Sequence, residues 1–142
     1  MLKGISKIIS PELLKILSEM GHGDEIVIAD GNFPSENYGK RVVRADACGG
    51  VEMLDAVLSL IPLDTYAEEN FYLMQTVAGD PTPTIWEEYF STAQKHDKNL
   101  RVGNLERFEF YERAKKAYAV IATGEGAVYA NIILKKGVIK QI

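Results

Sequence analysis

The segment EMGHGDEIVIAD, from Glu19 to Asp30, contains a histidine and carboxylates that could exchange protons with a substrate. His22 lies between two glycines, and histidine has an unperturbed pKa of about 6.5, so it can give or take a proton near neutral pH. The flanking glycines would let a substrate approach the backbone closely. The same pattern suits an exposed loop histidine after a helix, so the residues alone leave its role open.

Asp30 follows the apolar run Ile26–Ala29, which is typical of a strand buried on both faces. In α/β folds, ligands bind near the carboxyl ends of such strands. A charge at that position must be paired, solvated or used. Asp30 is therefore a candidate site residue, although an ordinary turn before Gly31 would also contain an aspartate.

A phenol and an amide lie close together near the C-terminal end, in the predicted strand 129–134. Because strand side chains alternate, Tyr129 and Asn131 are expected on the same face. They could satisfy each other or bind a polyol, since both groups need hydrogen-bond partners when buried. Arg107 precedes the predicted helix 108–117, and its local context alone indicates a surface arginine.

Other motifs exclude several kinds of site. The GHG triplet lacks the third glycine of a dinucleotide fingerprint, because residue 26 is isoleucine, and it joins a helix to a strand rather than the reverse. His22, His96 and Cys48 do not have the spacing of a transition-metal site. We therefore expect no essential metal, and we expect Cys48 to be a small buried residue rather than a nucleophile.

Alternating helices and strands must position these residues. Ser10 and Pro11 are typical of a helix start, and Gly21 is predicted to end that helix in the left-handed conformation. The patterns predict helices over 11–20, 51–61, 82–93 and 108–117, strands over 26–29, 41–45, 71–77, 118–122 and 129–134, and a loop over 31–39. This alternation favours a layered α/β fold, whose strand order the sequence does not show.

Composition limits the classes of function. The 142 residues, 46% hydrophobic and 25% charged, are expected to form one domain over 1–142. A net charge of -4 argues against nucleic-acid binding. The single cysteine suits a reducing compartment. The chain lacks a signal-peptide pattern and a run of about 18 apolar residues. We therefore expect a cytoplasmic protein without a membrane span.

Two long segments resemble the fucose mutarotase and ribose pyranase family. They are SPELLKILSEMGHGDEIVIAD at 10–30 and RFEFYERAKKAYAVIATGEGAVYANIILKKGV at 107–138, and both GNFP after Asp30 and VVRAD at 42–46 also fit. The resemblance covers nearly the whole chain, more weakly from 63 to 102. It implies an α/β fold of that family's type, a single layered domain with a largely parallel sheet and flanking helices.

The resemblance also implies a site and an assembly. His22 would be the catalytic acid, with Asp30, Arg107, Tyr129 and Asn131 around a monosaccharide, and Ala130 would add backbone contacts. Tyr129 is our candidate for a second catalytic proton carrier, if a neighbour such as Arg107 lowers its pKa from about 10. The family forms ring-shaped homo-oligomers, often decamers, with sites near subunit contacts. Sugar mutarotation moves only protons, so no cofactor is expected.

The family has a fucose branch and a ribose branch. Arg107, FYERA and LKKGV resemble the fucose branch, whereas Ala130 stands where that branch often has glycine. We therefore expect L-fucose mutarotase activity, by acid- and base-assisted opening and closure of the pyranose, with galactose or ribose as other possible sugars. The alternatives are ribose pyranase activity, a non-catalytic sugar-binding protein that accompanies transport, and a purely structural oligomer.

Overall fold

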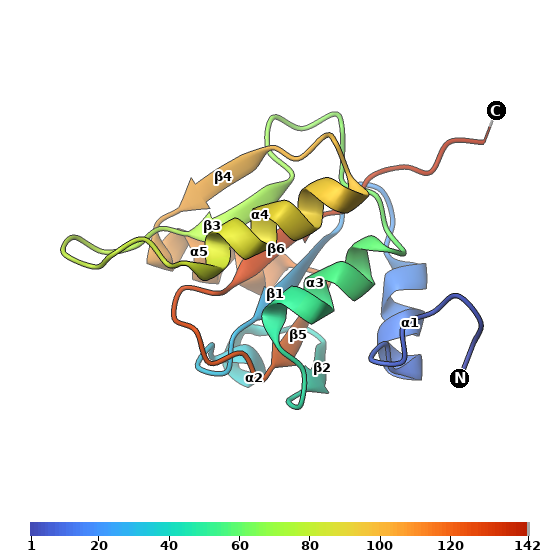
Figure 1. The fold of residues 1–142 in the computed structure, drawn as a ribbon, viewed down its shortest axis with the longest axis horizontal. Coiled ribbons are helices and arrows are strands. Elements are labelled where there is room, and N and C mark those ends of the chain that lie inside the picture. The colour runs from blue at the N-terminus through green and yellow to red at the C-terminus, as the bar shows by residue number, and fades with distance from the viewer. Residues whose placement is uncertain (142) are drawn as a thin grey trace.

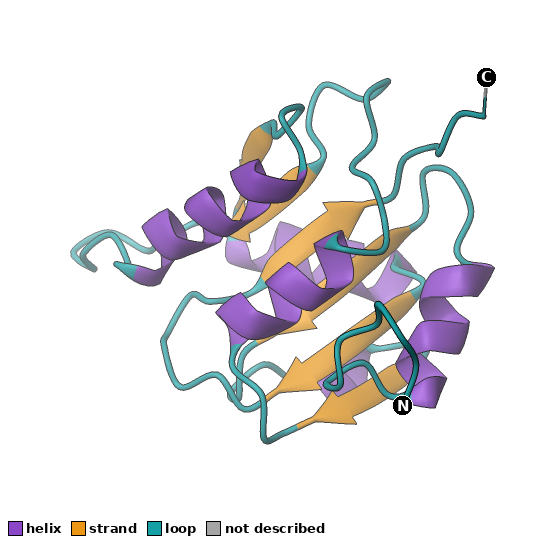
Figure 2. Ribbon diagram, turned by 45° about the vertical axis from the view of Figure 1, so that its right-hand side comes forward, coloured by secondary structure: helices purple, strands orange, loops and turns teal. Residues whose placement is uncertain are grey.

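The structure is a computed structural model that describes residues 1–141, and Ile142 lies outside the described residues. Within that range one six-stranded sheet has helices on both faces (Figures 1 and 2). The strands are β1 (Glu25–Ala29), β2 (Val42–Ala45), β3 (Phe71–Met74), β4 (Val102–Leu105), β5 (Ala119–Thr123) and β6 (Ile132–Lys135). The helices are α1 (Pro11–Glu19), α2 (Ser35–Tyr38), α3 (Gly50–Leu58), α4 (Ile85–His96) and α5 (Arg107–Lys116).

The strand order is β2-β5-β1-β6-β3-β4. β6 is antiparallel to its neighbours β1 and β3, whereas the other neighbouring pairs are parallel. The predicted α/β fold with a largely parallel sheet is therefore confirmed. The carboxyl ends of β1 to β5 and the amino end of β6 meet at one edge of the sheet, which we call the carboxyl edge. The opposite one is the amino edge.

Each face of the sheet has its own hydrophobic core. Helices α1, α3 and α4 cover one face, and α2 and α5 cover the other (Figures 1 and 2). In β1, Ile26 and Ile28 point into the first core, and Val27 and Ala29 point into the second. This explains why the strand is a continuous apolar run rather than an alternating one.

The two ends of α1 are held in different ways. The Ser10 hydroxyl accepts a hydrogen bond from the Leu13 amide at 3.1 Å, which confirms the predicted N-cap. At the other end, the Lys136 ammonium donates to the carbonyls of Leu17 and Met20 at 2.9 and 2.6 Å. Lys136, which follows β6, thus supplies the positive charge that the last turn of α1 lacks.

The prediction that Gly21 ends α1 in the left-handed conformation is wrong. The helix ends at Glu19, and the left-handed residue is Gly23, with φ 85°. The Gly21 amide instead donates to the Asp24 carboxylate at 2.8 Å. The turn presents His22 at the surface, with 47% of its side chain exposed.

Several predicted elements differ from the structure; for example, β3 ends at Met74 rather than 77, and α4 begins at Ile85 rather than 82. The predicted loop 31–39 contains the short helix α2, and β4 was missed, because VGNL has no apolar alternation and weak strand formers at its centre. The last strand begins at Ile132 rather than Tyr129. None of the helices within 1–141 has the length and apolar character needed to cross a membrane.

Candidate functional site

A cleft of about 560 Å³ opens at the carboxyl edge of the sheet. Four residues that the sequence analysis singled out line it: Asp30, Arg107, Tyr129 and Asn131. Asp30 follows β1, Arg107 begins α5 just after β4, and the other two precede β6. The cleft exists because β6 inserts antiparallel between β1 and β3, so that its amino end meets the carboxyl ends of its neighbours.

Asp30 and Asn131 are joined directly at the floor of this cleft. The backbone N–H of Asp30 donates to Asn131 Oδ1 at 2.7 Å. Asp30 is 5% exposed, and its Oδ1 accepts from the Asn32 amide at 3.0 Å. Burial raises the pKa of Asp30, and the backbone N–H donors around it offset only part of this effect. A carboxyl in this state is a candidate for proton exchange.

Tyr129 is placed by its backbone rather than by strand alternation. Its φ of 54° is left-handed, which a bulky residue adopts rarely, so the alternation argument for it was wrong. Helix α4 holds this conformation, because the Trp86 indole donates to the Tyr129 carbonyl and the Tyr89 hydroxyl to the Ala130 carbonyl, both at 2.8 Å. Tyr129 and Asn131 nevertheless line the same cleft.

The Tyr129 hydroxyl forms hydrogen bonds with two residues of the connection between β3 and α4, and the sequence did not indicate either contact. It donates to Asp80 Oδ2 at 2.5 Å and accepts from the Val77 amide at 3.3 Å. The hydrogen bond to Asp80 raises the pKa of Tyr129, and the nearby charge of Arg107 acts in the opposite direction with a smaller effect. The expectation that a neighbour lowers this pKa is therefore wrong. The raised pKa keeps Tyr129 protonated, and its hydroxyl donates a hydrogen bond to the Asp80 carboxylate.

Arg107 provides the positive charge of the cleft. Its Nε donates to the Tyr111 hydroxyl at 3.3 Å, and its guanidinium lies 5.3 Å from the ring centre of Phe108 and 5.6 Å from that of Tyr111. These contacts restrict the orientation of an otherwise exposed side chain that lines the cleft. The local sequence context, which indicated a surface arginine, could not show this.

Apolar side chains make up part of the lining of the cleft. They are Phe33, Met74, Pro81, Pro83 and Val128. Val128 is 62% exposed, so it presents apolar surface at the opening. The two prolines and Asp80 belong to the connection between β3 and α4. That loop has no hydrophobic periodicity, and so no pattern in the sequence marked it as part of a site.

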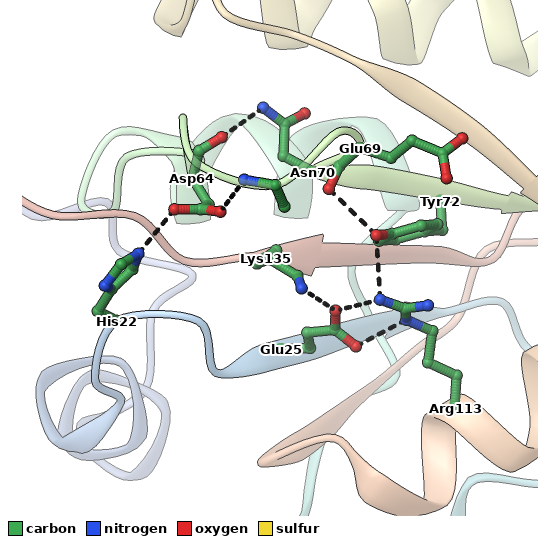
Figure 3. A network of polar contacts seen from close by, with 9 residues as sticks. His22, Glu25, Asp64, Glu69, Asn70, Tyr72, Arg113 and Lys135 are labelled. Atoms are coloured by element: carbon green, nitrogen blue, oxygen red, sulfur yellow. Dashed lines mark hydrogen bonds and ion pairs between the residues drawn. The ribbon is translucent and has the colours of Figure 1, made fainter.

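His22 does not reach this cleft within the chain. It lies at the amino edge, where its Nε2 is 2.8 Å from Asp64 Oδ1 (Figure 3). The five residues of β1 separate it from Asp30, a span of about 17 Å at ~3.3 Å per residue. The structure thus brings together Asp30, Arg107, Tyr129, Ala130 and Asn131, and places the predicted acid at the other end of the same strand.

The other reactive side chains that the sequence offers, Cys48 and His96, do not line this cleft. In the part of the chain that the structure describes, no three His, Cys, Asp or Glu side chains lie close enough together to hold a metal ion. Cys48 is half-buried, and burial raises the pKa of its thiol. His96 pairs with Asp55 on the surface at 2.7 Å.

Known proteins resemble this chain over almost its full length. The model of the RbsD / FucU transport protein family matches residues 3–139. A fucose mutarotase of Mus musculus is 54% identical over 144 residues, covering 96% of this chain and 94% of that protein. An L-fucose mutarotase of Actinobacillus pleuropneumoniae serotype 5b is 49% identical, covering 97% of each.

Solved structures agree with these matches. The fucose mutarotase of Streptococcus pneumoniae, solved in complex with L-fucose, has a TM-score of 0.94 and 50% identity, covering 98% of this chain and 100% of that one. Bacillus subtilis RbsD, complexed with D-ribose, has a TM-score of 0.73 and 25% identity, covering 99% and 100%. The family model, the relatives and the shared fold together show that this chain belongs to the RbsD / FucU family.

Proposed function

We propose that this protein is an L-fucose mutarotase, an isomerase that interconverts the α and β pyranose anomers of free fucose. One observation carries the proposal: a carboxyl, a guanidinium, a phenol and an amide line the cleft at the carboxyl edge together with apolar side chains. It does so in a chain that is 50% identical to a fucose mutarotase solved with L-fucose.

The chemistry of the cleft suits a 6-deoxy sugar. A monosaccharide presents hydroxyls that need donors and acceptors, which Asp30, Arg107 and Asn131 supply. Its C–H face and the 6-methyl group of fucose need apolar contact, which Met74 and Val128 supply. The Ala130 amide points at Asp30 Oδ2 over 3.4 Å, a distance long enough for a sugar oxygen to compete for this donor.

Mutarotation needs only two proton transfers in each direction. The ring oxygen gains a proton while the anomeric hydroxyl loses one, the open aldehyde turns about C1–C2, and the steps reverse on the other face. A well-placed acid or base contributes a factor of about 10²–10⁴ to such a reaction. Tyr129 is our candidate to take the proton of the anomeric hydroxyl while its own passes to Asp80, its hydrogen-bond acceptor.

His22 is the proposed acid, and it must come from a second copy of the chain. Within one chain, β1 separates it from Asp30 at the opposite edge of the sheet. An arrangement in which the amino edge of one subunit faces the cleft of the next would bring His22 of the first subunit close to Asp30 of the second. We therefore propose a ring-shaped homo-oligomer, a decamer as the family resemblance implies, built from single-domain subunits of 142 residues in the cytoplasm.

Saturation-transfer NMR at C1 of L-fucose tests the function. We expect the protein to speed anomer exchange strongly for L-fucose, and His22→Ala to remove the effect. The matched control is His96→Ala, which removes the other carboxylate-paired histidine and leaves exchange unchanged.

The same experiment with D-galactose and D-ribose separates the alternatives. Exchange between the pyranose and furanose rings of ribose, without effect on fucose, would instead identify a ribose pyranase. Fucose binding without faster exchange would identify a sugar-binding protein, and no binding would leave only a structural role. Full exchange by the His22→Ala protein would remove His22 from the mechanism while leaving the activity in place.

A further inference from the structure

The loop between β5 and β6 is held in place by the side chain of Glu125. This loop spans residues 124–131, and its C-terminal part, which includes Tyr129, lines the cleft. Glu125 Oε1 accepts a hydrogen bond from the Gly50 amide at 2.9 Å, and Oε2 accepts one from the Ala127 amide at 3.0 Å. One carboxylate therefore connects the middle of the loop to the first turn of α3.

The backbone of Glu125 connects the same loop to the end of β1. Its carbonyl accepts from the Gly31 amide at 2.8 Å, and Gly31 directly follows Asp30. Its amide donates to the Thr123 hydroxyl at 3.2 Å, and that hydroxyl donates to the Ala29 carbonyl at 2.6 Å. Glu125 therefore bonds to both of the segments whose polar side chains meet at the floor of the cleft.

The start of α3 is a favourable place for a carboxylate. The first amides of a helix have no acceptor within the helix, and the helix dipole favours a negative charge beside them. A second carboxylate uses the same helix end, because Glu52 Oε1 accepts from the Gly49 amide at 2.7 Å. The two acids differ in what they connect. Glu52 bonds to the start of its own helix, whereas Glu125 brings a separate loop to that helix.

Gly50 supports the loop in a second way, because it has no side chain. A Cβ at this position would collide with the Tyr89 hydroxyl, which donates to the Ala130 carbonyl at 2.8 Å. Burial raises the pKa of Tyr89, and the nearby charge of Glu125 adds to this effect, so the phenol stays a neutral donor. The contacts that meet at Gly50 therefore hold the loop both at Ala127 and at Ala130.

We propose that Glu125 is a positioning residue that keeps Tyr129 where it can exchange a proton with the sugar. This inference rests on the proposed function, in which Tyr129 is a proton carrier. Glu125 lies outside the lining of the cleft, so it acts through the loop that it holds. A displacement of about 1 Å in a group that takes part in the reaction can lower the rate roughly 10²-fold.

The indole N–H of Trp86 reports the position of the loop without any activity measurement. Trp86 is the one tryptophan of the sequence, and its indole donates to the Tyr129 carbonyl at 2.8 Å. In the Glu125→Ala protein we expect this N–H to change its NMR shift and to exchange with water roughly tenfold faster, because the loop opens more often without the two bonds of the carboxylate. An indole signal identical to that of the wild type in a folded Glu125→Ala protein would overturn the proposal.

Glu52→Ala is the matched control, since it removes the other carboxylate from the start of α3 and leaves the bonds of Glu125 in place. It should lower the urea midpoint of unfolding, as Glu125→Ala does, but leave the indole signal unchanged. Glu125→Gln carries the test if the alanine variant does not fold. Its side chain keeps one accepting oxygen and turns an NH₂ group toward the other amide, so the indole signal should change in the same direction.

Saturation transfer at C1 of L-fucose tests the consequence for catalysis. We expect kcat/KM of the Glu125→Ala protein to fall roughly 10²-fold, because the loop carries groups that bind the sugar and move its proton, and we expect Glu52→Ala to keep the wild-type value. Wild-type kcat/KM in folded Glu125→Ala, or an equal loss in Glu52→Ala, would refute the positioning role. If the indole signal responds as expected but the wild-type protein does not accelerate fucose exchange, the proposed function fails and the attachment of the loop by Glu125 stands.

Discussion

Single side chains in the cleft are tuned by partners that are distant in the sequence. Asp30 and Asn131 are 101 positions apart and share a 2.7 Å hydrogen bond. Tyr129 and Asp80, 49 positions apart, share the bond that raises the pKa of the phenol. A protonated phenol that donates a hydrogen bond to a carboxylate can act as a proton relay. Tyr129 would pass its own proton to Asp80 as it takes one from the sugar.

Tyr129→Phe tests this relay. Removing the hydroxyl should lower the rate of fucose anomer exchange by roughly 10²-fold, because one of the two proton transfers loses its carrier. The hydroxyl is exposed to solvent, so the urea midpoint of unfolding should hardly change. The measurement is saturation transfer at C1 beside a urea titration. A variant that exchanges fucose at the wild-type rate would exclude Tyr129 from the proton pathway.

Among the elements, α4 supports the cleft from outside, through hydrogen bonds to the backbone of residues 129 and 130. It lies on the face opposite α5, yet its Trp86 and Tyr89 side chains reach the backbone at 129 and 130. Tyr89 is fully buried, and burial raises the pKa of its hydroxyl, so it remains a neutral donor. The helix therefore holds Tyr129 in a left-handed conformation that its own side chain disfavours.

Tyr89→Phe should weaken that support. The buried Ala130 carbonyl loses its donor, which costs about 1–3 kcal/mol of unfolding free energy. We also expect KM for fucose to rise, since Tyr129 and Asn131 are then less well placed. Urea unfolding and fucose exchange measure the two effects. The control is Tyr118→Phe, whose hydroxyl makes an exposed 3.3 Å bond to Glu19 and whose loss should change stability by less than about 0.5 kcal/mol. Equal stability of the two variants would contradict the role of α4.

At the scale of the whole subunit, the sheet separates the proposed acid from the cleft. His22 and Asp64 lie at the amino edge, and Asp30 and Arg107 at the carboxyl edge. In a homo-oligomer, contact between unlike edges would repeat around a ring, because a head-to-tail interface closes when its rotation allows. Catalysis would then depend on assembly rather than on the fold of one subunit.

Mixing two inactive variants tests this dependence. His22→Ala and Arg107→Ala each remove one half of the proposed site, so each alone should be inactive. In mixed oligomers about one site in four would combine an intact His22 from one subunit with an intact cleft from the other. We therefore expect co-expressed chains to recover about a quarter of the wild-type exchange rate. Complete absence of recovery in oligomers shown to be mixed would mean that each chain supplies its own acid.

Local patterns were enough to predict most of the elements. The Ser10 cap and the apolar run before Asp30 have signals within a few residues, and both are confirmed. β4 had no such signal, because it is an edge strand whose residue at 103 is glycine, and it forms by pairing with β3. The left-handed turn was assigned to Gly21 rather than Gly23, since either glycine could adopt it.

The residue types of the cleft were also accessible from the sequence, with the help of the family resemblance. The resemblance implied that these residues meet around one sugar, but no local pattern showed it, because their meeting depends on the insertion of β6 between β1 and β3 and on the approach of α4 to residues 129 and 130. The pKa directions of Asp30 and Tyr129 follow from burial and from bonds between distant segments. The sequence thus determines which ionisable side chains are present. The burial and the hydrogen-bond partners that shift their pKa values arise only when the sheet assembles.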